Sequence, residues 1–94
     1  MKIPCGNKIY DVHVILRGKQ YLFMTGTHRP FMKINVPYLD ESKDILAIKN
    51  YGENEGLLDL LKKQGVVIEQ VGEVESGFVM IPLVKINIQK LIAL

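Results

Sequence analysis

The stretch ILAIKNYGENEGLLDLLKKQGVVIEQV, residues 45–71, decides the fold because it predicts a strand, a helix and a strand in succession. Its first five residues form a short apolar run that suits a buried strand. Leu57, Leu58 and Leu61 then recur at helical spacing, and two lysines occupy the last turn. Asn54 is the predicted N-cap, and Gly65 suits the position just past the helix. These signals together predict a helix over residues 54–64.

The apolar run VVIEQV, residues 66–71, follows the glycine directly and predicts the next strand. A strand, a helix and a strand in this order form a βαβ unit. We therefore expect residues 45–49 and 66–71 to be parallel strands joined by a right-handed crossover.

The chain before this unit predicts three strands. Residues 8–16 alternate between apolar and wetter positions, and residues 21–24 form a hairpin with them across a glycine-containing turn. Residues 31–36 predict a third strand, with Met32, Ile34 and Val36 on one face and Lys33 and Asn35 on the other. Pro30 and Pro37 bracket it, which indicates strand ends or a sheet edge.

The chain after residue 71 predicts a turn at residues 72–77 and a long strand at residues 78–88. The apolar alternation of this strand changes phase near Pro82, and a bulge or bend there would explain the change. The last segment, QKLIAL at residues 89–94, fits either a continued strand or a terminal helical turn.

The predicted order is β-β-β-β-α-β-β in one domain over residues 1–94. The fold class is α+β, with a small mixed and curled β-sheet and one main helix packed on one face. One helix leaves the other face of such a sheet under-covered. Three outcomes are open: the sheet curls on itself, the second face is polar and solvated, or a homodimer buries it. Self-association as a homodimer is the expected partner interaction.

The run from Ile45 to Leu83 resembles the βαββ half of ACT-like regulatory domains. Gly56-Leu57-Leu58 stands where that family opens its helix, and Gly65-Val66-Val67-Ile68 stands where it opens the following apolar strand. The resemblance covers less than half of the chain and implies only the local order of elements.

Composition narrows the class of function. Twelve basic and ten acidic residues give a net charge of +2 without a basic stripe, so a nucleic-acid partner is not expected. The single cysteine, Cys5, excludes an intramolecular disulfide and fits a reducing compartment. No apolar run approaches the roughly 18 residues of a spanning helix. We expect a soluble cytoplasmic protein with no membrane partner and no cofactor.

The candidate site is the connection TGTHRP, residues 25–30. Thr25, Thr27 and Arg29 offer hydrogen-bond donors, Arg29 suits a carboxylate or phosphate, and His28 titrates near neutral pH. These four residues are the predicted ligand-binding set. The alternative is an ordinary turn between strands, because the same residue types are common in turns.

Other reactive side chains form no recognised motif. His13 and Asp11 share a strand face and His28 follows on the next connection, but their spacing matches no metal site, so none is predicted. Cys5 has no activating neighbour in sequence. Asp40, Glu41 and Asp44 form an acidic loop without the spacing of a calcium site.

The absence of a complete catalytic motif favours a non-catalytic binding or interaction module, whose ligand is a partner protein or a small anionic molecule. The alternative is a small enzyme acting on an anionic metabolite, with His28 or His13 as general acid–base. Catalytic residues are not assigned by the sequence.

Overall fold

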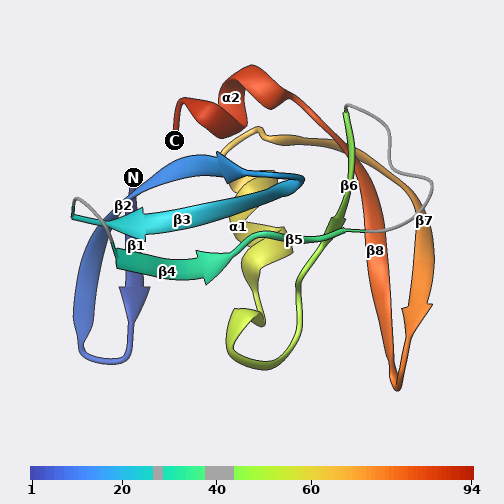
Figure 1. Ribbon diagram of the computed structural model, residues 1–94, viewed down its shortest axis with the longest axis horizontal. Helices are drawn as coiled ribbons and strands as arrows, with labels where there is room; N and C mark the ends of the chain where they lie inside the picture. Colours follow the sequence, from blue (N-terminus) through green and yellow to red (C-terminus); the bar gives the residue numbers. More distant parts are fainter. Residues whose placement is uncertain (27–28, 38–43) are drawn as a thin grey trace.

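The protein is α+β, as the sequence predicts. A computed structural model describes residues 1–26, 29–37 and 44–94, and these form two four-stranded sheets and two α-helices (Figure 1). Every strand pairing in the described ranges is antiparallel. Two sheets thus take the place of the single mixed sheet, with the strands in broadly the predicted order.

The first sheet has the order β1-β2-β3-β4. Its strands are β1 (Lys2–Cys5), β2 (Lys8–Arg17), β3 (Gln20–Thr25) and β4 (Arg29–Lys33). The predicted β2–β3 hairpin is confirmed, with Gly18 at φ +63° in its two-residue turn. Strand β1 was not predicted from the sequence, where KIPC is short and contains a proline.

The second sheet has the order β5-β6-β8-β7. Its strands are β5 (Asn35–Val36), β6 (Ile45–Ile48), β7 (Val67–Ser76) and β8 (Val79–Ile86). The single predicted strand at residues 31–36 is therefore wrong, because Ile34 separates β4 from β5 and the chain changes sheets there. Pro30 lies in β4, an edge strand, as its missing N–H predicts.

Residues 45–49 and 66–71 were predicted to be parallel strands, and β6 and β7 do run in the same direction, but they are not neighbours in the sheet. Strand β8 lies between β6 and β7 and pairs antiparallel with both, so these two strands run in the same direction without touching. This is the split βαβ arrangement. The helix between β6 and β7 leaves space for one more strand, and the β7–β8 hairpin folds back to fill it (Figure 1).

The predicted turn at residues 72–77 is also wrong, because β7 continues to Ser76 and the turn is Gly77-Phe78. The register of β7 against β8 shifts between Val67 and Glu69 and between Gln70 and Gly72. The second shift lies opposite Leu83 and Val84 of β8, next to Pro82, where the sequence predicted a bulge or bend. The extra residue of this bulge belongs to β7 and not to β8.

The main helix, α1 (Leu57–Lys63), follows a 3₁₀ turn at Gly52–Asn54. Asn54 is not the N-cap: that position is Gly56, and the Asn50 side chain accepts from the Leu58 N–H at 2.9 Å. The C-terminal end is as predicted. Gly65 has φ +73°, its N–H donates to the Lys62 carbonyl, and Val66 N–H donates to the Leu61 carbonyl, which together form a Schellman motif.

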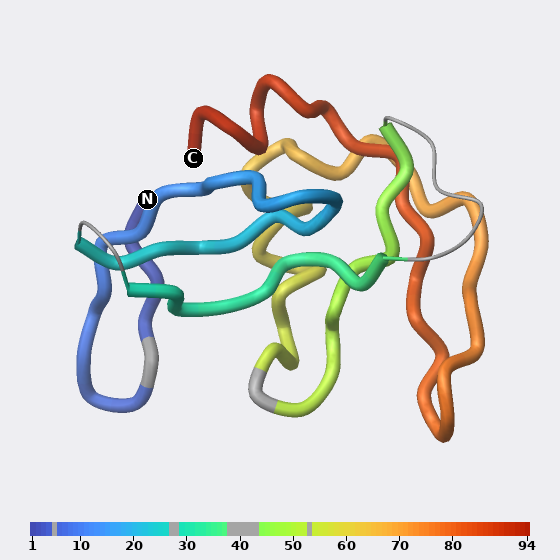
Figure 2. Tube along the Cα trace, in the orientation of Figure 1, coloured from blue at the N-terminus to red at the C-terminus, as the bar shows by residue number. Residues whose placement is uncertain are grey.

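The C-terminal segment resolves as a helix, α2 (Ile88–Ile92), and not as a continued strand. Asn87 is its N-cap, because the Asn87 side chain accepts from the Lys90 N–H at 3.1 Å. Leu91 anchors the helix in the core. The two ends of the chain lie side by side (Figure 2), with the Met1 nitrogen 3.5 Å from the Leu94 carbonyl oxygen.

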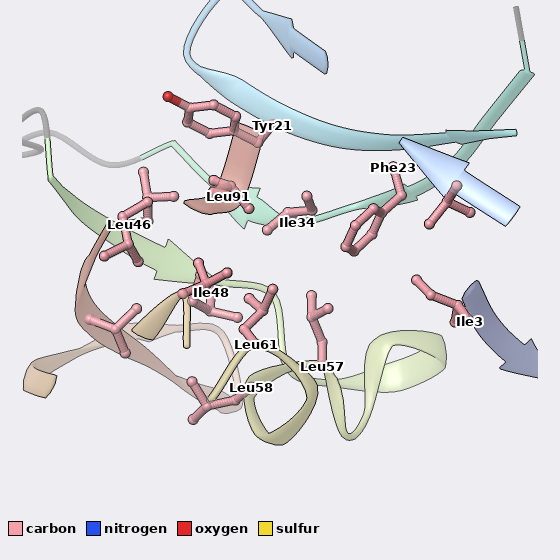
Figure 3. Close-up of a cluster of buried hydrophobic side chains, with 14 residues drawn as sticks. Ile3, Tyr21, Phe23, Ile34, Leu46, Ile48, Leu57, Leu58, Leu61 and Leu91 are labelled. Atoms are coloured by element: carbon pink, nitrogen blue, oxygen red, sulfur yellow. The ribbon is translucent and has the colours of Figure 1, made fainter. Parts of the chain in front are cut away.

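One cluster of buried side chains draws on both sheets and both helices. Phe23 and Ile34 point from the first sheet and its junction toward Leu57 and Leu61 of α1, with Ile48 of β6 beside them (Figure 3). The helical stripe predicted from Leu57, Leu58 and Leu61 is buried as expected. In the ranges that the structure describes, no helix is long and apolar enough to cross a membrane.

Asn35 joins the two sheets. The sequence places it with Lys33 on the strand face opposite Met32, Ile34 and Val36, and in the structure it is fully buried. Its side-chain oxygen accepts from the Tyr21 N–H at 2.7 Å, and its side-chain nitrogen donates to the Lys19 carbonyl at 3.1 Å. Gln20 donates back to the Asn35 carbonyl at 2.9 Å. The Asn35 side-chain amide thus takes the place of a backbone peptide group and satisfies the backbone groups of Lys19 and Tyr21 at the start of β3.

Candidate binding groove

A groove of about 580 Å³ opens where β2 and β4 end and β3 begins, beside the end of β6. We call it the cationic groove. The residues lining it are Arg17, Gln20, Leu22, Pro30, Phe31, Met32, Lys33, Lys49 and Asn54.

Strand register explains how the first wall of the cationic groove forms. Gln20 and Leu22 are two residues apart on β3 and therefore point to one face of the sheet. Arg17 pairs directly opposite Gln20, and Lys33 pairs directly opposite Leu22. Cross-strand partners share a face, so these four side chains gather on the same side. Tyr21 and Phe23 belong to the other face, in the core.

The second wall comes from the segment after β6. The Lys49 N–H donates to the Ile34 carbonyl at 2.9 Å, which holds Lys49 next to the end of β4. Asn54 is buried, and its side-chain nitrogen donates to the Lys33 carbonyl at 2.5 Å. That hydrogen bond ties the 3₁₀ turn to β4. The Lys49 Nζ also lies 5.8 Å from the centroid of the Tyr51 ring.

All charged residues among the described lining of the cationic groove are positive. Three of its nine described lining residues are cations, Arg17, Lys33 and Lys49, and none is acidic. Two amide side chains, Gln20 and Asn54, add hydrogen-bonding groups. Like charges gathered in a concave surface raise the local concentration of anions. An arginine fork and two ammonium groups suit carboxylate or phosphate oxygens.

An apolar groove of about 240 Å³ continues from the cationic groove and shares Phe31, Met32 and Asn54 with it. It runs between β1 and the start of α1. Its other lining residues are Ile3, Pro4, Glu55, Gly56, Leu57 and Leu60. Phe31 is held by Tyr10, with ring centroids 5.0 Å apart. The two grooves together offer a charged end and an apolar end.

The structure brings together two of the four residues predicted to bind a ligand. Thr25 and Arg29 are directly opposite each other on β3 and β4. Arg29 is exposed, and neither residue lines the two grooves. Thr27 and His28 lie outside the described residues. The predicted ligand site at this hairpin end therefore stays a prediction.

The other reactive side chains do not meet in the described structure. His13 is exposed on β2, opposite Met24, and it does not line either groove. The Cys5 side chain, His28, Asp40 and Glu41 lie outside what the structure describes. Within residues 1–26, 29–37 and 44–94, no group of three His, Cys, Asp or Glu side chains is placed to hold a metal ion. General acid–base catalysis by either histidine stays a prediction.

Sequence reasoning missed the cationic groove because its cations come from three separate segments. Arg17 stands in a turn sequence, Lys33 on the wetter face of a predicted strand, and Lys49 at a strand end. None of these three cations indicates a binding site from its own sequence context. The β2–β3 hairpin was predicted, and its register places Arg17 beside Gln20, but the position of Lys49 in the same groove depends on the junction of the two sheets.

Comparison with known proteins adds no assignment. No family model matches the chain, and no curated protein or solved structure matches it either.

Proposed function

We propose that the protein is a non-catalytic binding module whose cationic groove takes an anionic group of its ligand while the adjoining apolar groove takes an apolar group. The observation that carries the proposal is the clustering of Arg17, Lys33 and Lys49 in one concave surface without an acidic lining residue among those described. The preferred ligand is an acidic segment of a protein that also carries an aromatic side chain.

The position of Phe31 and Met32 supports a ligand with both kinds of group. Phe31 and Met32 are half-buried and line both grooves, so one ligand can contact them while reaching the cations. Aromatic and methionine side chains are typical of binding surfaces. A cytoplasmic location, which the single cysteine favours, belongs to the same proposal.

A calorimetric titration with an acetylated tetrapeptide of alternating glutamate and phenylalanine tests this function. The wild-type protein is expected to bind it, and the double variant Arg17→Ala, Lys33→Ala to bind about tenfold or more weakly, because two charge-assisted contacts are lost. The matched control is Lys62→Ala, Lys63→Ala, which removes the same charge from the exposed end of α1. Its affinity should equal that of the wild type.

The same titration separates the groove from the hairpin end predicted from the sequence. Arg29→Ala is expected to leave the affinity unchanged if the peptide occupies the cationic groove, because Arg29 does not line it. Loss of binding in Arg29→Ala, with full binding in the Arg17, Lys33 double variant, would reject the groove and favour the hairpin end. Equal loss in the Lys62, Lys63 control would show that only net charge matters.

A further inference from the structure

We propose that the partner of the cationic groove is the end of the β7–β8 hairpin of a second copy of this chain. This inference rests on the proposed function and names the occupant of the same site. We call the occupant the hairpin tip: Glu73, Glu75 and Phe78 with Met80 and Pro82 on the same ribbon.

The hairpin tip extends beyond the rest of its sheet. Strand β6 pairs with β8 only at Leu83, Val84 and Lys85. Among the described strands, residues 73–76 and 79–82 are therefore paired only with each other, and they form a two-stranded ribbon that runs to the Gly77-Phe78 turn (Figure 1). Phe78 at the turn is 108% exposed, the largest value among the exposed hydrophobic residues.

One face of the hairpin tip combines carboxylates and apolar groups. Glu75 pairs opposite Met80 and Glu73 opposite Pro82, so these four side chains share a face. Val74 and Ile81 lie between them on the inner face, and Ile81 is buried. Met80 is 55% exposed, and no other described residue forms an ion pair with Glu73 or Glu75. An exposed aromatic and a methionine beside unpaired carboxylates favour a protein contact.

The hairpin tip and the paired grooves match in chemistry. In the proposed complex, the carboxylates of Glu73 and Glu75 lie against Arg17 and Lys33, and Phe78 and Met80 lie against the apolar groove lined by Phe31 and Met32. Complementary potentials of this kind set orientation and partner choice. Because the net charge of the chain is only +2, overall repulsion between copies is weak.

The strand edges disfavour the other simple route to self-association. Edge strands join copies when their backbone groups are open. Here β1 contains Pro4, β4 contains Pro30, β5 has two residues and β7 has two shifts of register. Prolines, short strands and bulges blunt sheet edges. Contact through side chains at the groove is therefore favoured over pairing of strands.

A charge exchange measured by sedimentation velocity tests this inference. The hairpin variant is Glu73→Lys, Glu75→Lys, and the groove variant is Arg17→Glu, Lys33→Glu. Each variant alone has like charges on both surfaces, so self-association should weaken about tenfold or more. An equimolar mixture restores opposite charges and should regain association. About 0.15 M salt screens non-specific attraction beyond roughly 8 Å.

Two further variants complete the design. Phe78→Ser changes an exposed turn side chain without touching the core, and it is expected to weaken association while the thermal midpoint stays at the wild-type value. Lys62→Glu, Lys63→Glu on α1 is the matched control and should associate like the wild type. A wild-type mass that does not rise with concentration overturns the inference, and so does unchanged association of the hairpin variant. Peptide titration of the same samples then decides separately whether the proposed groove function stands.

Discussion

Asn35 is the residue on which the arrangement of the two sheets depends most directly. Its buried amide binds the Tyr21 N–H and the Lys19 carbonyl, and its backbone carbonyl accepts from Gln20. A buried backbone group that loses its partner costs about 1–3 kcal/mol. The same contacts fix the start of β3, from which Gln20 and Leu22 enter the cationic groove.

We predict that Asn35→Leu lowers the free energy of unfolding by about 2–4 kcal/mol. Leucine leaves the Tyr21 N–H and the Lys19 carbonyl without the hydrogen bonds that the Asn35 amide makes to them. Urea denaturation followed by circular dichroism measures the change. Gln89→Ala, an exposed amide on α2, is the control and should stay within about 0.5 kcal/mol of the wild type. A similar small change for Asn35→Leu would mean that the amide does not hold the sheets together.

At the scale of single elements, the end of α1 is the feature that the sequence predicted best. Glycine after two lysines is a local signal, and the structure has Gly65 in the left-handed region, closing a Schellman motif. The start of α1 was predicted less well. Asn54 looked like a cap, but its side chain reaches the Lys33 carbonyl, a partner 21 residues away in the chain that local sequence does not specify.

Gly65→Ala is expected to destabilise the protein by about 1 kcal/mol, because φ +73° is unfavourable for alanine and its Cβ would lie 3.1 Å from the Lys90 Nζ. Gly72→Ala is the matched comparison. Its Cβ would meet only Leu83 at an ordinary 3.7 Å, so the stability should not fall. Thermal melts of both variants measure the difference. Equal effects at the two positions would contradict the backbone argument.

At the scale of the whole molecule, the sequence identified most strands but, apart from the β2–β3 hairpin, not which strands are neighbours. Periodicity reports which face of a strand is buried, whereas pairing depends on contacts distant in the chain. The position of β8 between β6 and β7 was therefore not predicted. The strand predicted at residues 31–36 is in fact divided at Ile34 between the two sheets. The cationic groove lies at that division, which is why no single segment predicted it.

The central claim is that an acidic, aromatic-bearing ligand occupies the cationic groove, and chemical-shift mapping tests it most directly. The backbone amides of a ¹⁵N-labelled sample are followed while the glutamate–phenylalanine tetrapeptide is added. We predict that the largest shifts fall on Gln20, Leu22 and Lys33, with smaller shifts on Phe31 and Met32. Shifts confined to Thr25 and Arg29, or to the exposed face of α1, would contradict the claim.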